Sequence, residues 1–318
     1  MKYVISHQSA LEYWRKNRKL PGSSAERRYR GSLPDRQYEL EPQTFSGFIL
    51  PVHVLIGNRS ARKRSKTIRQ HLHSGNTPVG CFTNIGEKFI VCSPEFCFLQ
   101  MANQLTLIRL IELGYELCGT YSLPVTGDPF VPERGFYNRP PLTSVKKLEV
   151  FLNHMQGNKG HVKVMRALRY MQNDSASPME TKLAIILTLP YKLGGFGLAG
   201  AELNWRVIPT KAAKRSSGKA IYVCDLFWAD HNLAVEYDSN SFHTHQRQIA
   251  DDSKKRNALT TMGITPITVT KQQLYDRQEF EKIARAIAKG LGKRLVFKNP
   301  GFNTAHNDLR EQLQLNFD

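Results

Sequence analysis

IYVCDLFWADHNLAVEYD, residues 221–238, predicts a β-hairpin. Two runs rich in β-forming residues flank a four-residue interruption, ADHN at 229–232. A turn centred on Asp230 and His231 sets the register, and in that register Asp225 lies directly opposite Glu236. Alternation sorts the side chains into two faces. The predicted core face holds Cys224, Leu226, Trp228, Leu233, Val235 and Tyr237, and the opposite face holds Val223, Asp225, Phe227, Ala234, Glu236 and Asp238.

Three carboxylates gather on this second face. In the predicted register, Asp225, Glu236 and Asp238 lie within about 5 to 8 Å of one another. Because like charges on facing strands destabilise a sheet, this placement favours a bound divalent cation. Mg²⁺ prefers oxygen ligands and is commonly held by one or two carboxylates, with water and substrate phosphate completing its shell. The alternative is a wider or bulged turn that points the acids into solvent.

Basic and titratable residues follow the hairpin. His243 comes five residues after Asp238 and has the ordinary pKa, about 6.5, that suits acid-base chemistry. By itself, an ordinary surface histidine is the simpler interpretation. On the polar helix predicted across 246–261, Lys255 or Arg256 could reach a phosphate, and a solvated charged face explains them equally well.

Glu180 stands in the first turn of a helix predicted from Ser177 through Leu189. Ser177-x-x-Glu180 is a capping-box pattern, so a helix cap explains this glutamate, and a carboxylate facing the metal is the alternative. Strands are predicted at 203–208, 221–228, 233–238 and 264–270. Helices around such strands predict an α/β or α+β domain with a mixed sheet.

The first half of the chain is predicted to be a small mixed α/β domain. Helices are expected at 10–19, 144–155 and 162–171, and one or two more from Ser93-Pro94-Glu95 to near Gly114. A strand is expected at Phe48–Ile56. Seven Pro and Gly residues between 122 and 142 indicate an interdomain boundary. We therefore expect a basic domain at 1–140, a helical connector at 141–175, a second domain at 176–300 and a tail at 301–318.

The chain is strongly basic. Its 318 residues include 45 Lys and Arg against 27 Asp and Glu, a formal net charge of +18, shared equally between residues 1–150 and 151–318. This charge favours nucleic acid as the partner over an anionic membrane surface, because no basic helix has a clear apolar face. One segment has six basic residues and no acid, and it is a candidate phosphate-binding segment or a solvated loop: Arg59, Arg62, Lys63, Arg64, Lys66 and Arg69.

Composition excludes several other classes of protein. The longest apolar runs, such as Leu183–Leu187, are far shorter than the roughly 20 residues that cross a bilayer. The apolar stretch Tyr3–Ile5 is too brief for a signal peptide, so we expect a cytoplasmic protein. Five cysteines without CxxC pairs predict buried free thiols rather than disulfides or a metal site.

The order of the acids resembles that of a known family. The matching residues are SPMET at 177–181, VCDLFW at 223–228, LAVEYD at 233–238, Phe242-His243, Asp252 and Leu259. Over about residues 176–275 the chain resembles endonuclease-like domains related to very-short-patch-repair endonucleases, in the PD-(D/E)XK nuclease superfamily. The resemblance implies a restriction-endonuclease-like mixed sheet flanked by helices and Mg²⁺-dependent hydrolysis of DNA phosphodiesters.

The resemblance also implies a role for each acid. Asp225 would be the central metal ligand, Glu236 the second acid, Glu180 the helix acid, Asp238 the third strand carboxylate and His243 the trailing histidine. One position departs from the family pattern. Asp238 stands where the superfamily has a lysine, so the charge-stabilising lysine either comes from elsewhere, with Lys255 as the candidate, or is absent.

The amino-terminal half resembles, more weakly, the antitoxin component of abortive-infection toxin–antitoxin systems. The matching stretches are SAL at 9–11 with Trp14-Arg15, PVHVL at 51–55 and VCSPE at 91–95. Regions of this kind are associated with DNA binding and phage defence. The resemblance therefore implies a DNA-binding domain at this end of the chain.

We expect a Mg²⁺- or Mn²⁺-dependent DNA endonuclease that acts in phage defence or DNA repair. Asp225 and Glu236 would hold the metal, and Glu180, Asp238 or His243 would orient or deprotonate the attacking water. Lys255 would offset charge in the transition state, and residues 59–69 would hold the duplex. The alternatives are a catalytically inactive, antitoxin-like DNA-binding regulator and an RNA-directed nuclease. A second copy of the chain or a defence-system protein stays open as a further partner.

Overall fold

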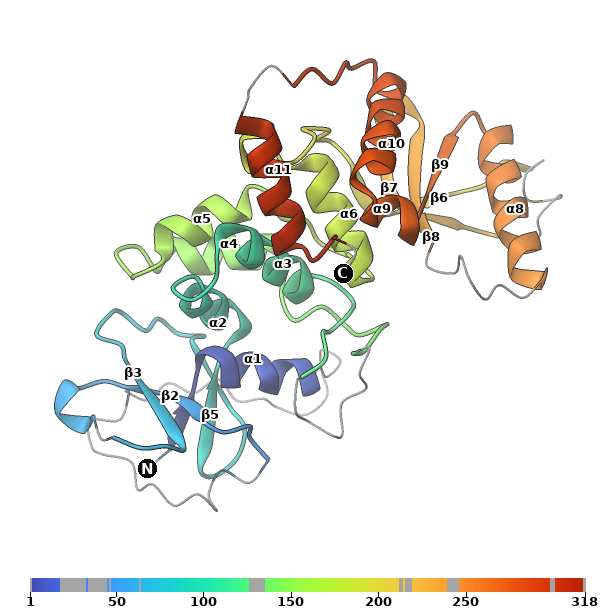
Figure 1. The fold of residues 1–318 in the computed structure, drawn as a ribbon. Helices are drawn as coiled ribbons and strands as arrows, with labels where there is room; N and C mark the ends of the chain where they lie inside the picture. The colour runs from blue at the N-terminus through green and yellow to red at the C-terminus, as the bar shows by residue number, and fades with distance from the viewer. Residues whose placement is uncertain are drawn as a thin grey trace. The chain divides into compact units, whose positions relative to one another are not determined.

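A computed structural model describes residues 2–17, 33, 45, 47–62, 64–125, 135–211, 214, 219–238, 246–297 and 301–316. The chain forms two compact units, Met1–Asn173 and Asp174–Asp318 (Figure 1). The division lies two residues from the domain start expected at 176. No helix in the described ranges is long and apolar enough to cross a membrane. All five cysteines are free and buried, so the prediction of buried thiols is confirmed.

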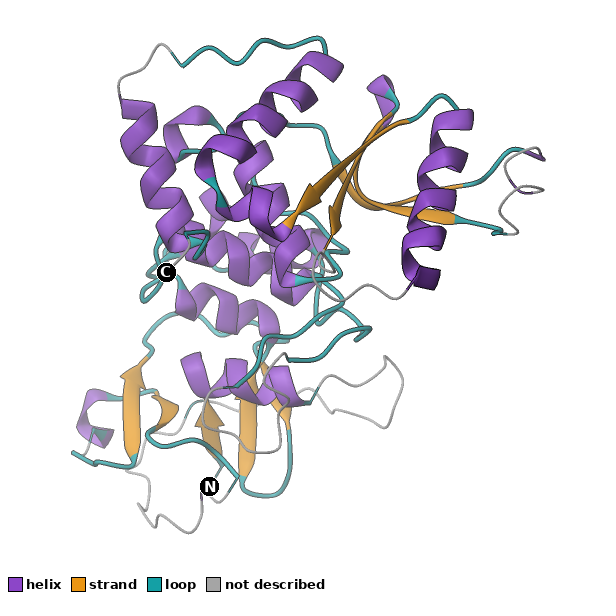
Figure 2. Ribbon diagram, turned by 45° about the vertical axis from the view of Figure 1, so that its right-hand side comes forward, coloured by secondary structure: helices purple, strands orange, loops and turns teal. Residues whose placement is uncertain are grey.

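A five-stranded mixed sheet lies in the amino-terminal unit (Figure 2). The strand order is β3-β2-β1-β5-β4, with β1 at Tyr3–Ile5, β2 at Val52–Ile56, β3 at Ile68–Leu72, β4 at Phe82–Asn84 and β5 at Phe89–Cys92. β2 runs parallel to β3, and β1 runs parallel to β5. The strand predicted from Phe48 begins only at Val52, directly after Pro51, which has no N–H to donate to a ladder.

Within the described residues, this unit also contains the α-helices α1 at His7–Lys16, α2 at Pro94–Met101, α3 at Leu107–Cys118, α4 at Val145–Asn153 and α5 at His161–Leu168, and a 3-10 turn, η2, at Arg59–Ala61. The predicted helix start at Ser93 is confirmed, since its hydroxyl accepts the Phe96 N–H at 3.2 Å. The predicted helix end near Gly114 is wrong. Gly114 lies inside α3, where a Cβ atom would come within 2.2 Å of the Met171 side chain, so close packing explains this glycine.

The helical connector expected at 141–175 is also wrong. α4 and α5 pack against α2 and α3, and their apolar faces, which include Leu148, Leu152 and Val164, are fully buried. This burial makes them part of the amino-terminal unit. The Pro- and Gly-containing stretch at 122–142 is therefore a connection within the unit and not its end.

The carboxy-terminal unit contains a four-stranded sheet of order β6-β7-β8-β9. The strands are β6 at Glu202–Val207, β7 at Tyr222–Trp228, β8 at Leu233–Asp238 and β9 at Thr265–Thr270, and only β8 and β9 are parallel. The predicted hairpin register is confirmed, because Leu226 pairs with Val235 and Trp228 with Leu233. A short 3-10 turn, η4 at Ala229–His231, joins the two strands.

Helices cover both faces of this sheet, as expected for a mixed sheet flanked by helices. Figure 1 shows α8 on one side and α6 and α10 on the other. The helices are α6 at Pro178–Thr188, α8 at Gln246–Thr261, α9 at Lys271–Tyr275, α10 at Arg277–Gly290 and α11 at Gly301–Gln312, with η3 at Tyr191–Leu193. The bounds of α8 and β8 agree with the sequence prediction.

The predicted division of the hairpin into two faces is wrong in part. Cys224 was expected on one face of the hairpin, and Phe227 and Ala234 on the other. All three instead pack into one apolar cluster with Ala258 and Leu259 of α8. The regular pairing of β6 with β7 is interrupted between Leu226 and Cys224, opposite Asn204, which has a φ of +49°.

The tail expected at 301–318 is wrong for its described part, which contains α11. Arg310 in this helix is only 1% exposed. Its guanidinium donates to the carbonyls of Leu274, Tyr275 and Leu315 at 2.6 to 3.1 Å. A buried guanidinium requires such acceptors, so α11 is an integral part of the carboxy-terminal unit.

Candidate functional site

A cavity of about 270 Å³ opens between the sheet and α8 in the carboxy-terminal unit. We call it the carboxylate cavity. Its ionisable lining residues are Asp225, Glu236, Asp238, Asp252, Lys255 and Arg256. The structure therefore brings together three of the predicted acids with Lys255 and Arg256, the two basic residues predicted to reach a phosphate. Asp252 lines the same wall and was not given a role by the sequence pattern, beyond its place in the resemblance.

Asp225 lies where the regular ladder between β7 and β8 stops. Its Oδ2 accepts the Tyr237 N–H at 2.7 Å, so the carboxylate takes the place of a backbone acceptor. Burial, together with the nearby charges of Glu236 and Glu180, raises the pKa of Asp225 to about 8. Ionising this carboxyl group at neutral pH therefore requires a compensating positive charge.

Glu236 is paired with Lys255. The Lys255 Nζ donates to Oε2 at 2.7 Å, and both side chains are mostly buried, with exposed fractions of 24% and 17%. Oε1 of Glu236 is buried and accepts no hydrogen bond of good geometry within the described part of the chain, although the Cys224 thiol and the Asp225 backbone lie near this carboxylate. Burial raises the pKa of Glu236, and the ammonium of Lys255 opposes that rise. The pair thus leaves one carboxylate oxygen available to a further cation.

Lys255 lies on the side of α8 that packs against the sheet, so its side chain reaches the carboxylate cavity. Leu259 lies one turn after it on the same side of the helix and packs into the apolar cluster on the sheet. Lys254, the preceding residue, is 61% exposed and pairs with Asp251 on the outer surface of the helix. Helical geometry therefore separates two neighbouring lysines into one that faces the acids and one that faces solvent.

Glu180 acts as a helix cap and also lies near Asp225. The Ser177 hydroxyl accepts the Glu180 N–H at 3.1 Å, as the capping pattern predicted. The carboxylate returns to the Ala176 N–H at 2.9 Å, one residue before the cap, and it accepts a second bond from Asn204 at 2.8 Å. Asn204 therefore fixes the Glu180 carboxylate close enough to raise the pKa of Asp225.

His243 lies outside the described residues, so its predicted place beside the acids stays a prediction. Asp238, at the end of β8, lines the carboxylate cavity. Within the ranges that the structure describes, no three His, Cys, Asp or Glu side chains are arranged to hold a metal ion. The expected gathering of three acids as one set of ligands is thus not seen. Asp225 and Glu236 offer two hard oxygen donors, a number that fits Mg²⁺ when water and phosphate supply the rest.

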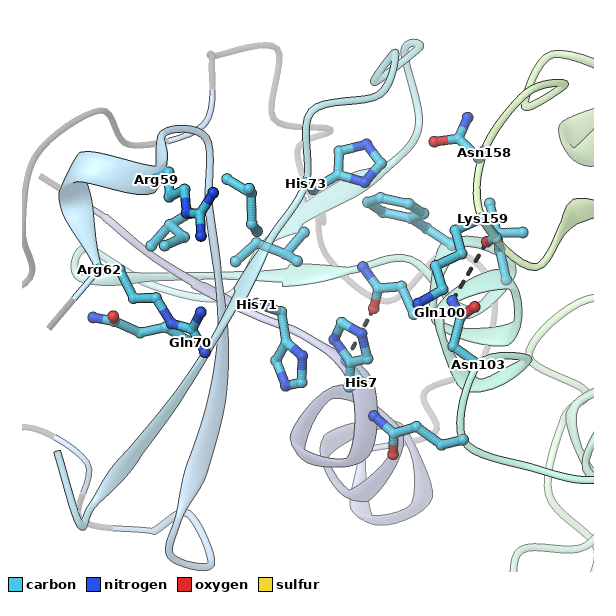
Figure 3. A pocket seen from close by; sticks show the side chains of 16 residues that line it. His7, Arg59, Arg62, Gln70, His71, His73, Gln100, Asn103, Asn158 and Lys159 are labelled. Carbon is cyan, nitrogen blue, oxygen red and sulfur yellow. Dashed lines mark hydrogen bonds between the residues drawn. The ribbon is translucent and has the colours of Figure 1, made fainter. Parts of the chain in front are cut away.

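A second cavity, of about 530 Å³, lies in the amino-terminal unit (Figure 3). We call it the histidine pocket. Two residues of the basic segment, Arg59 and Arg62, line it. Arg64, Lys66 and Arg69 are exposed outside it, and Lys63 lies outside the described residues. The predicted phosphate-binding segment is therefore the β2–β3 connection, and only part of it borders a cavity.

Histidines form one wall of this pocket. The rings of His7 and His71 stack with centroids 3.7 Å apart, and Nε2 of His71 lies 3.2 Å from Nδ1 of His53. Burial lowers the pKa of His7 to about 2 and that of His71 to about 4, helped by the neighbouring histidines. The rings are neutral at physiological pH. This cluster could not be predicted from the sequence, because His7 begins α1 while parallel pairing of β2 with β3 brings His53 near His71.

We expect the amino-terminal unit to lose stability as pH falls from 7.5 to 5. The unfolded chain protonates His7 near pH 6.5 and the folded chain does not, so unfolding takes up a proton and stability falls with pH. His7 alone accounts for about 2 kcal/mol at pH 5. Urea unfolding would measure it, followed by the fluorescence of Trp14 in a chain whose other two tryptophans, Trp205 and Trp228, are replaced by phenylalanine. His7→Asn, which tolerates the φ of +49°, should flatten the dependence; an unchanged slope would contradict this origin.

Comparison with known proteins adds nothing to this geometry: no family model, no curated protein and no solved structure matches the chain. The observations that bear on function are therefore local ones. They are two buried carboxylates beside a lysine in one unit, and a basic pocket with stacked histidines in the other.

Proposed function

We propose that the carboxy-terminal unit is a metal-dependent nuclease that hydrolyses phosphodiester bonds in DNA. The observation that carries the proposal is the pair of carboxylates, Asp225 and Glu236, which neighbouring strands bring to one cavity beside Lys255. A buried oxygen of Glu236 that accepts no hydrogen bond of good geometry from the described residues is costly unless something binds it. The restriction-endonuclease-like fold that the sequence resemblance implies belongs to the same proposal.

The carboxylates and the lysine have distinct roles in this proposal. Asp225 and Glu236 would hold Mg²⁺ or Mn²⁺. The chemistry that such an ion supplies is polarisation of the scissile phosphate and a lowered pKa of the attacking water. Lys255 offsets negative charge on the phosphate, and Asp238, Glu180 or His243 orients the water. Tyr237 fixes Asp225 through its N–H, so this carboxylate is held in place before substrate arrives.

Three observations support DNA as the substrate. The net charge of +18 favours a polyanion, and counterion release from phosphates makes such binding strong at low salt. Arg59, Arg64 and Lys66 are exposed on the amino-terminal unit, where they would contact phosphates without reading sequence. The resemblance to nuclease and antitoxin families adds phage defence or DNA repair as the setting.

A catalytically inactive DNA-binding regulator is the second candidate. One observation favours it: Lys255 already neutralises Glu236, and the described residues form no cluster of three metal ligands. In that protein the lysine would stabilise a degenerate site. The same basic surfaces would still bind DNA, so binding alone cannot separate the two functions.

Incubation of supercoiled plasmid with the full chain tests the proposal. We expect nicked and linear products with Mg²⁺ or Mn²⁺ and none with EDTA. Single-stranded and duplex RNA in parallel reactions separate the RNA-directed alternative, because cleavage of RNA alone would exclude DNA as the substrate. Retarded migration of the plasmid without any cutting, in either metal, would favour the regulator and overturn the nuclease.

A further inference from the structure

The histidine pocket has no part in the proposed nuclease chemistry, and its size suits a small organic ligand. Its volume of about 530 Å³ lies within the range of roughly 300–1,000 Å³ typical of ligand sites. It is bordered by β2, β3, the start of α1, α2 and the α4–α5 connection (Figure 3). All of these elements belong to the amino-terminal unit, so the pocket is complete within it.

The pocket is positively charged on two sides. Arg59 and Arg62 enter from the β2–β3 connection, and Lys159 enters from the α4–α5 connection, on the other side in Figure 3. None of the three makes an ion pair with a residue that the structure describes, and no Asp or Glu is among the lining residues. Unpaired cations that face one cavity, without any acid, favour an anionic ligand.

The approach of Lys159 depends on Gly160. This glycine caps α5 with a φ of +91°, and a Cβ atom there would lie 3.0 Å from Ala102 and 3.2 Å from the Leu99 carbonyl. A side chain at this position would push the connection away from α2. The Asn103 side chain also donates to the Lys159 carbonyl at 3.4 Å, which ties the connection to the end of α2 (Figure 3).

The other residues that line the histidine pocket suit a planar nucleobase. The stacked rings of His7 and His71 are neutral, and because His7 is buried beneath it, the half-buried His71 ring presents its outer face to the pocket. Aromatic faces of this kind stack on nucleobases. The side-chain amides of Asn103 and Asn158 each donate to a backbone carbonyl. This leaves the Asn103 oxygen as an acceptor for a base edge, whereas Oδ1 of Asn158 lies against Gly75.

We propose that the histidine pocket binds a nucleoside monophosphate unit, either a free nucleotide or the phosphorylated end of a nucleic-acid strand. The phosphate lies among Arg59, Arg62 and Lys159, and the base lies against the imidazole rings and the Asn103 amide. A simple polyanion would not use the aromatic wall, and an uncharged nucleoside would not use the cations. The inference is independent of cleavage in the carboxy-terminal unit.

Isothermal titration calorimetry of the full chain with AMP, adenosine and inorganic phosphate tests whether the pocket binds a nucleotide, a nucleoside or phosphate alone. The buffer contains EDTA and the chain carries Asp225→Asn, so the carboxylate cavity does not contribute. We expect saturable binding of AMP at one site, with adenosine and phosphate each at least about tenfold weaker, since each lacks half of the contacts. Phosphate binding as tightly as AMP, or no saturable AMP binding, would overturn the proposal.

Variants that each remove one positive charge, inside or outside the histidine pocket, test whether AMP binds there. Arg62→Gln and Lys159→Gln should each weaken AMP at least about tenfold. Arg169→Gln and Lys147→Gln, which remove exposed charges of the same unit outside the pocket, should leave the affinity within about twofold. Equal weakening by the pocket and control variants would show attraction by net charge alone, which contradicts a built site. All four positions are exposed, so folding is not at risk.

Oligonucleotides distinguish the two sources of the ligand. A 12-residue DNA strand with a 5′-phosphate is compared with the same strand ending in a 5′-hydroxyl. Binding of the 5′-phosphorylated strand at least about tenfold tighter than of the 5′-hydroxyl strand assigns the pocket to strand ends, and equal binding of the two strands beside saturable AMP binding assigns it to free nucleotides. Because the titrations contain no divalent metal, a failure here leaves the nuclease proposal intact, and an inactive nuclease leaves this pocket intact.

Discussion

Asp225→Asn is expected to reduce metal-dependent plasmid cleavage by about 10³-fold or more, which corresponds to about 4 kcal/mol of transition-state stabilisation. The substitution keeps the shape of the side chain and the acceptor for the Tyr237 N–H. It removes the negative charge that would hold the metal ion. Initial rates of nicking at saturating Mg²⁺, compared with the unmodified chain, measure the effect.

Asp230→Asn is the matched control for this variant. Asp230 lies in the η4 turn of the same hairpin, is exposed, and does not line the carboxylate cavity. Each variant replaces one carboxyl group of the same hairpin by an amide, so at saturating Mg²⁺ a general effect on DNA attraction would appear in both. Unchanged cleavage in Asp225→Asn, or an equal loss in Asp230→Asn, would contradict the assignment of Asp225.

The pH dependence of the free energy of unfolding provides a second test of Asp225→Asn. The pKa of Asp225 is raised to about 8, so between pH 4 and pH 8 the folded metal-free protein holds a proton that the unfolded chain releases. Stability in EDTA should therefore fall as pH rises through this window, by up to about 1.4 kcal/mol per pH unit. Asp225→Asn should remove this slope. Addition of Mg²⁺ at pH 8 should stabilise the unmodified chain and not the variant.

The facing carboxylates could be predicted because they depend on local geometry alone. A short interruption between two apolar runs sets the register of an antiparallel pair, and this register brings Asp225 and Glu236 together just beyond the last regular pair, Leu226 with Val235. The switch of faces near Asn204 could not be predicted. It coincides with a break in the pairing of β7 with β6, a strand that reaches the hairpin only through the sheet.

The choice between Lys255 and Arg256 also lay beyond the sequence. α8 is strongly polar, and in its described part only Ala258 and Leu259 are buried, so no apolar stripe marks which side faces the sheet. Both basic residues border the carboxylate cavity, and the ion pair to Glu236 is made by Lys255. Tertiary packing, and not helical periodicity, sets this contact.

The amino-terminal sheet was largely missed for a different reason. β1 and β4 have three residues each, which is too few for alternation to distinguish a strand from a loop. β3 contains Arg69, Gln70 and His71 and lacks a continuous apolar run. The neighbours of these strands come from distant parts of the chain, so the approach of His7 to His71 could not be read from spacing.

Lys255→Ala is expected to destabilise the metal-free protein by about 3 kcal/mol at pH 8. Removing one partner of a buried pair typically costs about 3–5 kcal/mol, and the partial exposure of this pair places it at the low end. Lys254→Ala is the matched control, because its pair with Asp251 is exposed and worth at most about 1 kcal/mol. Urea unfolding in EDTA measures both, and equal effects would contradict the role of the buried pair.

Addition of Mg²⁺ to Lys255→Ala then separates a nuclease from a regulator. If Glu236 is a metal ligand, a cation at the site replaces the missing ammonium, and millimolar Mg²⁺ should restore most of the lost stability. Cleavage should stay low, because the charge that Lys255 presents to the phosphate is still absent. If the lysine only neutralises a degenerate site, Mg²⁺ should leave the variant as unstable as it is in EDTA. Lys255→Arg keeps the ion pair and should be stable in both buffers, so loss of stability there would show that packing, and not charge, explains the alanine variant.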